Sequence, residues 1–149
     1  MGRCERLCTG TAQDPACPEG YFCAQGWGLN DVVCVPDCDP LAQDCPSATD
    51  ACNLMSGQWG CYPRDSTTKG DARWPCSFPN DCAPFFACVR EEDFAGCSNS
   101  HGACCAPICD LEDPDADSVC AAAGLGLSCK PWPPEGEPAG YDHVGACIP

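Results

Sequence analysis

The stretch Cys34-Val-Pro-Asp-Cys38-Asp recurs as Cys105-Ala-Pro-Ile-Cys109-Asp, and its first half returns as Cys61-Tyr-Pro and Cys147-Ile-Pro. Each copy ends a group of four cysteines. The second and third cysteines of a group stand five to eight residues apart, whereas the last loop varies from eight to 17 residues. A nearly constant spacing in the middle of each group, followed by a last loop of variable length, is typical of a repeated module. The four units are Cys8, Cys17, Cys23, Cys34; Cys38, Cys45, Cys52, Cys61; Cys76, Cys82, Cys88, Cys105; and Cys109, Cys120, Cys129, Cys147.

These units divide the chain into tandem modules at 1–35, 36–62, 76–106 and 107–149, with a cysteine-free linker at 63–75. Turn residues such as Asp39-Pro40 and Asp113-Pro114 lie between the first two cysteines of a unit. Short extended segments precede the last cysteine, as in Gln58-Trp59-Gly60-Cys61. The sequence therefore predicts a small disulfide-rich fold of irregular, short β-hairpin modules in tandem, paired two and two around the linker. Helix is expected for one or two turns at 117–123.

The composition requires a covalent or metallic constraint. Leu, Ile, Val and Phe number 20 of 149 residues, and the formal net charge is −15. A chain so poor in these residues buries too little apolar surface to offset its conformational entropy. The 19 cysteines are the candidates for that constraint.

The cysteine spacings favour disulfides over metal thiolates. The chain contains no Cys-x-x-Cys and no Cys-x-Cys, the spacings on which most zinc and iron–sulfur sites depend. Sequence does not determine pairing. We expect the first cysteine of each unit to bond the third, and the second to bond the fourth.

Three cysteines lie outside the units. Cys97 and Cys104 are seven residues apart in one loop and form an expected extra pair. Three residues separate Cys4 from Cys8, the first cysteine of a unit. Cys34 and Cys105 have the same spacing to the first cysteine of the next unit, so Cys4 resembles the closing cysteine of a preceding module. We expect Cys4 to be free or to join a second molecule, giving a disulfide-linked dimer or a longer array.

Charge and apolar patterning exclude two kinds of partner. Seven basic residues against 22 acidic ones argue against nucleic acid. No apolar run reaches the ~18 residues that a spanning helix needs, so membrane insertion is not expected. Many cysteines indicate an oxidising compartment, extracellular or at the cell surface, although residues 1–4 do not resemble a signal peptide. We expect the signal peptide to lie outside this chain.

The phrase Asp37-Cys38-Asp39-Pro40-Leu41-Ala42-Gln43-Asp44-Cys45-Pro46, closing at Cys61-Tyr62-Pro63, resembles a motif of cysteine-rich secreted proteins and lipoproteins of predatory gliding soil bacteria. The likeness covers residues 34–63 closely and the rest by spacing. It implies export and disulfide bonding, and it implies no reaction. The chain has no lipobox of the kind that the lipoprotein members carry.

No catalytic motif stands out. His101 and His143 are the histidines, and neither belongs to a Gly-x-Ser-x-Gly or His-Glu-x-x-His pattern. We therefore expect a non-catalytic protein. One hypothesis is a secreted scaffold or protein-interaction module, and the alternative is a calcium-stabilised or carbohydrate-binding module with an extracellular protein or glycan as partner.

Two sets of residues bear on the alternative. Asp113, Asp115 and Asp117 alternate along an acidic loop, as oxygen ligands of calcium often do, although a solvated acidic loop has the same pattern. Apart from such a calcium ion, no cofactor is expected. Trp27, Trp59 and Trp132 could stack on sugar rings, or they could form the small core of each module.

Overall fold

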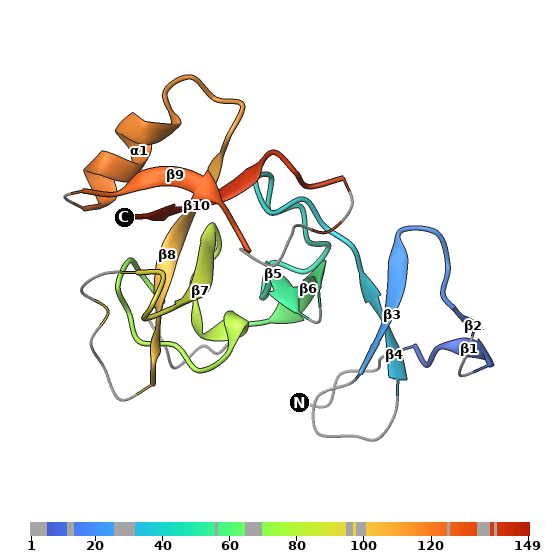
Figure 1. Ribbon diagram of the computed structural model, residues 1–149. Helices are drawn as coiled ribbons and strands as arrows, with labels where there is room; N and C mark the ends of the chain where they lie inside the picture. Colours follow the sequence, from blue (N-terminus) through green and yellow to red (C-terminus); the bar gives the residue numbers. More distant parts are fainter. Residues whose placement is uncertain are drawn as a thin grey trace.

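The structure is a computed structural model that describes residues 6–11, 14–25, 32–55, 57–64, 70–94, 97, 101–124, 126–133, 138 and 140–149. Antiparallel strands, nine disulfides and a single α-helix make up these residues, which confirms a small disulfide-rich fold with little helix (Figure 1). The elements are β1 (Thr9–Thr11), β2 (Asp14–Ala16), β3 (Tyr21–Gln25), β4 (Val32–Pro36), β5 (Asp50–Met55), β6 (Gln58–Pro63), a 3-10 turn η1 (Pro79–Asp81), β7 (Phe86–Arg90), β8 (Ala103–Asp110), α1 (Ala116–Ala123), β9 (Ser128–Pro131) and β10 (Val144–Ile148).

Each cysteine unit contains the same antiparallel strand pair. The strands are β3–β4, β5–β6, β7–β8 and β9–β10, and in every pair the third cysteine lies directly opposite the fourth. Directly opposed residues point to the same face of a pair of strands. The two side chains could bond each other, but they bond the preceding loop instead. The opposed pairs are Cys23–Cys34, Cys52–Cys61, Cys88–Cys105 and Cys129–Cys147.

The disulfides fasten that loop across the strands. In all four units the first cysteine bonds the third and the second bonds the fourth, which is the pairing expected from the sequence. A ninth bridge joins Cys97 to Cys104, so the vicinal Cys104 and Cys105 belong to different bridges. The unit bridges are Cys8–Cys23, Cys17–Cys34, Cys38–Cys52, Cys45–Cys61, Cys76–Cys88, Cys82–Cys105, Cys109–Cys129 and Cys120–Cys147.

Strand β8 joins the last two units into one sheet of order β7-β8-β10-β9. Its first half pairs with β7 and its second half with β10. The module boundary expected between residues 106 and 107 therefore falls inside β8. Helix α1 lies against this sheet beside β9, near the top of Figure 1.

The second half of the expected linker is part of the third unit. Arg73 N donates to Cys105 O (2.8 Å), Cys105 N donates to Trp74 O (2.8 Å), and Cys76 N donates to Ala103 O (3.1 Å). Residues 73–76 thus run along β8, and Gly70 accepts a hydrogen bond from Ala83 N. Residues 70–75 do not form a linker; residues 65–69 lie outside the described residues.

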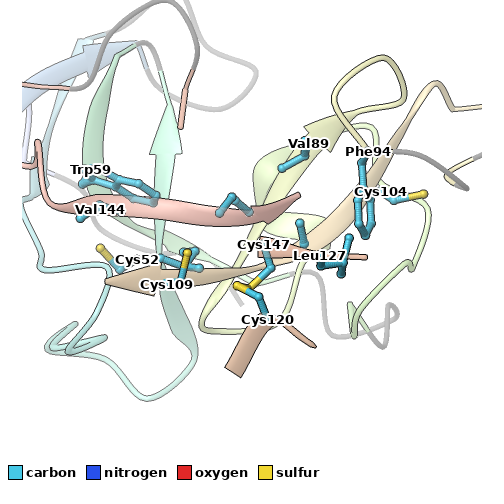
Figure 2. Close-up of a cluster of buried hydrophobic side chains, with 14 of the residues drawn as sticks. Cys52, Trp59, Val89, Phe94, Cys104, Cys109, Cys120, Leu127, Val144 and Cys147 are labelled. Atoms are coloured by element: carbon cyan, nitrogen blue, oxygen red, sulfur yellow. A yellow bond between two sulfur atoms is a disulfide. The ribbon is translucent and has the colours of Figure 1, made fainter. Parts of the chain in front are cut away.

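One hydrophobic core is shared by units two, three and four (Figure 2). Trp59 comes from the second unit, Val89 and Phe94 from the third, and Leu127 and Val144 from the fourth, and each is buried. Bridged cysteines fill the space between them. The arrangement of modules two and two is therefore not observed, because the second unit packs on the third and fourth.

The first unit packs on the second through a smaller cluster of Val33, Val35 and Tyr62. Phe22 adds its ring to this cluster. The two hairpins meet closely at Gly60, where an added Cβ would lie 2.7 Å from Phe22 Cζ and 2.9 Å from Val35 Cγ1. A glycine is needed at this contact. In the part of the chain that the structure describes, no helix is long and apolar enough to cross a bilayer.

Candidate functional site

Two carboxylates of the acidic loop bind backbone N–H groups in this structure. Asp113 Oδ1 accepts a hydrogen bond from Asp115 N (2.9 Å), and Asp117 Oδ1 accepts one from Cys129 N (2.9 Å). Among the described residues, no acidic oxygens belong to a group of three ligand atoms within 4.8 Å of one another. Asp113, Asp115 and Asp117 are exposed and are not brought together. Two of these carboxylates bind backbone N–H groups, which stabilises the turn and fastens α1 to β9.

Sulfur atoms do gather in each unit. Three of the four cysteines of every unit place their Sγ atoms within 4.8 Å of one another, as Cys38, Cys45 and Cys61 do. These sulfurs are already bonded in two adjacent disulfides. The clusters are therefore the covalent centres of the modules.

The tryptophans differ in how deeply they are buried. Trp59 is 2% exposed and packs on Trp132 and Tyr141, with ring centroids 6.3 and 6.5 Å away. Of the two roles considered for this tryptophan, the structure places it in the shared core, although it also lines the pocket described below. Trp132 is half-buried against the same core. Trp27 and Cys4 lie outside the described residues.

The two histidines lie in different surroundings. His101 is exposed, and its Nδ1 lies 2.7 Å from Ser77 Oγ. His143 stacks on Tyr141, with ring centroids 6.5 Å apart. Asp81, the acid nearest in sequence to Ser77, accepts hydrogen bonds from Ser77 N and Phe78 N at its Oδ2. That carboxylate oxygen binds the backbone of the turn.

A pocket of about 270 Å³ lies where the first, second and fourth units meet. Residues 20–22 and Asp37 form one side, residues 57–59 form the second, and Pro138 with Tyr141 forms the third. Tyr21 is exposed, whereas Phe22 and Tyr141 are half-buried. Aromatic rings, one amide and one carboxylate therefore face a single small space.

The backbone around this pocket is fixed by hydrogen bonds and bridges. Asp37 N donates to Gly20 O (3.0 Å) and so ties the end of β4 to the turn before β3. Tyr141 Oη donates to Cys38 O (3.0 Å) across 103 residues of sequence. Cys38 is itself bridged to Cys52. Tyr141 of the fourth unit is thus held beside the first two units, where it lines the pocket.

The surroundings of the pocket are acidic. The pKa of Tyr141 is raised, first by burial and then by the negative charges of Asp37, Asp39 and Asp44. Asp39 Oδ1 accepts hydrogen bonds from Leu41 N and Ala42 N, and Asp44 Oδ1 accepts one from Asp39 N. Asp37 is exposed, and its carboxylate makes no hydrogen bond or ion pair with the described residues.

Sequence reasoning missed this pocket. Its residues come from three units and share no spacing, so no motif marks them. The nearest sequence signal is a pair of glycines, Gly20 and Gly57, both with φ near +78°, which mark turns at the pocket rim.

No protein-family model, curated protein or solved structure matches the chain.

Proposed function

We propose that this chain is a secreted, non-catalytic binding scaffold that acts outside the cell or at the cell surface. Its stapled hairpins form the frame, and its surface loops contact another extracellular molecule. The number of disulfides is typical of extracellular proteins. The likeness of residues 34–63 to exported cysteine-rich proteins supports the same location.

One observation carries the proposal: the same crossed pair of bridges recurs four times on loops of different lengths. A repeated frame with variable loops presents different surfaces at little cost in stability. Loops fixed on a rigid frame lose little entropy on binding, so they suit recognition.

The direct test is a selection on the folded protein with a displayed peptide library, run beside a glycan array. We expect ligands that bind the oxidised protein and are lost after reduction and alkylation of the cysteines. Equal capture by the reduced chain, or no ligand from either collection, would contradict a folded binding scaffold.

A glycan is the second candidate partner. The amide of Gln58 and the rings of Tyr21 and Tyr141 line one pocket, and sugars are bound by such polar groups beside aromatic faces. The glycan array tests this candidate directly.

A further inference from the structure

We propose that the pocket between the first, second and fourth units receives the cationic end of a Lys or Arg side chain from a basic protein partner. This inference rests on the proposed function, because it names the partner chemistry of a binding scaffold. It is carried by the size of the pocket, its one unpaired carboxylate, its ring faces and its open rim.

The size of the pocket selects a single side chain. Its volume of about 270 Å³ lies below the ~300–1,000 Å³ of most small-molecule sites. Residues 20–22 with Asp37, residues 57–59, and Pro138 with Tyr141 bound it on three sides. One extended side chain fits such a space.

The charge of the pocket selects a cation. Among the lining residues that the structure describes, Asp37 is the acidic one and none is Lys, Arg or His. Asp39 and Asp44 already bind backbone N–H groups of their own loop, and their negative charges act on Tyr141 of the pocket. Asp37 is available to pair. On a chain of net charge −15, an anionic ligand would be repelled.

The rings add a second attraction for the same group. Tyr21, Phe22 and Tyr141 line the pocket, and ring faces attract ammonium and guanidinium groups. Tyr141 is held in place by its hydrogen bond to Cys38 O. A carboxylate beside aromatic faces is the arrangement that recognises a basic side chain while its methylene stem lies on the rings.

Two glycines keep the rim open. A Cβ placed on Gly57 would meet no atom within 4 Å, so this side of the rim borders open space. A Cβ on Gly20 would lie 3.5 Å from Asp37 Oδ1, in the region where a ligand would reach the carboxylate. The carboxylate can therefore be approached from outside.

The test follows backbone amide signals of the oxidised protein by NMR during titration with the capped peptide Gly-Gly-Lys-Gly-Gly. The matched ligand carries acetyl-lysine, which keeps the stem and removes the charge. We expect shifts confined to Gly20, Asp37, Gly57 and Gln58, with a Kd on the order of a millimolar for one side chain. Acetyl-lysine should cause no such shifts.

Asp37→Asn should weaken lysine binding about tenfold, because it removes the charge that pairs with the ammonium group. Glu112→Gln removes one charge from an exposed residue that lies outside the pocket and is the control. It should leave the Kd unchanged. Equal weakening by both variants would show that general charge is responsible and would overturn the site.

The outcomes separate this inference from the proposed function. If neither Gly-Gly-Lys-Gly-Gly nor the same peptide with arginine in place of lysine shifts the pocket amides while the library selection still yields ligands, the inference fails and the binding scaffold stands. If di-N-acetylglucosamine shifts these amides and the basic peptides do not, the pocket is a sugar site and the inference fails. If the selection yields no ligand, the proposed function fails.

Discussion

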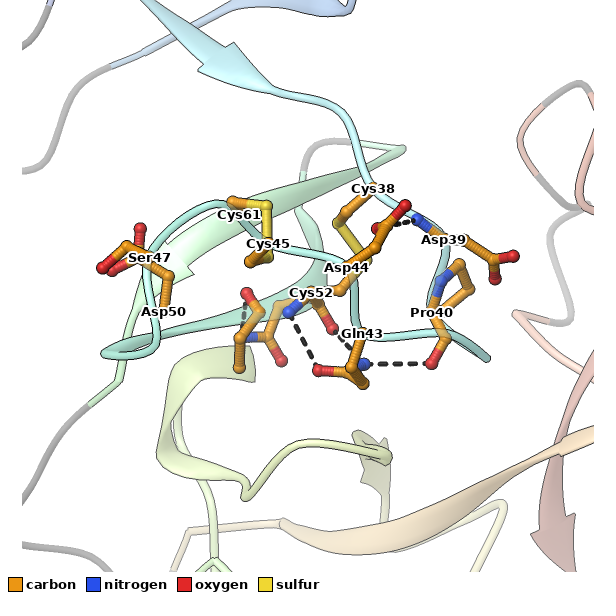
Figure 3. Close-up of a disulfide and its surroundings, with 12 residues drawn as sticks. Cys38, Asp39, Pro40, Gln43, Asp44, Cys45, Ser47, Asp50, Cys52 and Cys61 are labelled. Atoms are coloured by element: carbon orange, nitrogen blue, oxygen red, sulfur yellow. Dashed lines mark hydrogen bonds between the residues drawn. A yellow bond between two sulfur atoms is a disulfide. The ribbon is translucent and has the colours of Figure 1, made fainter.

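The side chain of Gln43 hydrogen-bonds to both backbone groups of Cys52 from within a loop (Figure 3). Its Oε1 accepts from Cys52 N (3.1 Å), and its Nε2 donates to Cys52 O (3.3 Å) and Pro40 O (2.9 Å). Gln43 has φ of 53°, a backbone conformation that few side chains adopt. The contacts to a buried strand offset that strain.

Gln43→Ala should lower the free energy of unfolding by about 1–3 kcal/mol, because two backbone groups of the buried Cys52 lose their partners. Urea unfolding followed by fluorescence measures this loss. Gln58→Ala, at an exposed glutamine of the same unit, is the control and should change stability by less than about 0.5 kcal/mol. A comparable loss in both variants would contradict the role of Gln43.

Gly60 sets the distance between the first two hairpins. Gly60→Ala should cost about 1–3 kcal/mol, because the new methyl group overlaps Phe22 and the stiff, β-branched Val35. The same substitution in a Val35→Ala background should cost less, since the obstacle is smaller. Thermal unfolding of the parent protein, the two single variants and the double variant gives the coupling free energy between the two positions. Additive effects of the two substitutions would contradict the contact.

Burial raises the pKa of Tyr62 from its ordinary value of 10.0 to about 12. A raised pKa means that the folded chain keeps a proton that the unfolded chain has lost. Stability from this group is therefore complete below pH 10 and declines as the pH rises from 10 to 12, by about 2–3 kcal/mol. Brief urea unfolding between pH 9 and 12 should show that decline, and Tyr62→Phe should flatten it. An unchanged decline in the variant would rule out Tyr62 as its source.

At the scale of elements, the cysteine spacing indicated four units, each with a hairpin. The spacing did not determine which cysteines pair, and the crossed pairing that we expected is the one that the structure shows. The same spacing could not reveal that β8 continues through the 106/107 boundary. That continuity depends on the backbone edges of β7 and β10, which pair with its two halves.

The bridges should differ in their contribution to stability according to loop length. Cys97–Cys104 spans seven residues of sequence and Cys120–Cys147 spans 27, and all four cysteines are buried. Replacing the longer pair by alanines should cost roughly 1 kcal/mol more than replacing the shorter pair, by loop-closure entropy. Urea unfolding of the two double variants measures the difference. The opposite order would mean that local packing outweighs loop closure.

At the scale of the whole molecule, contacts between distant residues decide the arrangement of units. Trp59 packs on Trp132 and Tyr141, and Tyr141 reaches Cys38. No periodicity in the sequence signals these contacts, because each unit has the same turn chemistry and few apolar residues. The shared core, and the pocket that it creates beside Tyr21 and Asp37, could therefore be found only in the folded chain.

The crossed pairing within each unit is tested most directly in the second unit, where each cysteine can be placed on its own peptide. Cleavage before Asp37, Asp39, Asp44 and Asp50, combined with cleavage after Met55, separates Cys38, Cys45, Cys52 and Cys61. Mass spectrometry of the unreduced digest should find the Cys38 peptide linked to 50–55 and the Cys45 peptide linked to the fragment holding Cys61. A link between the Cys52 and Cys61 peptides, directly across the hairpin, would contradict the stapled fold.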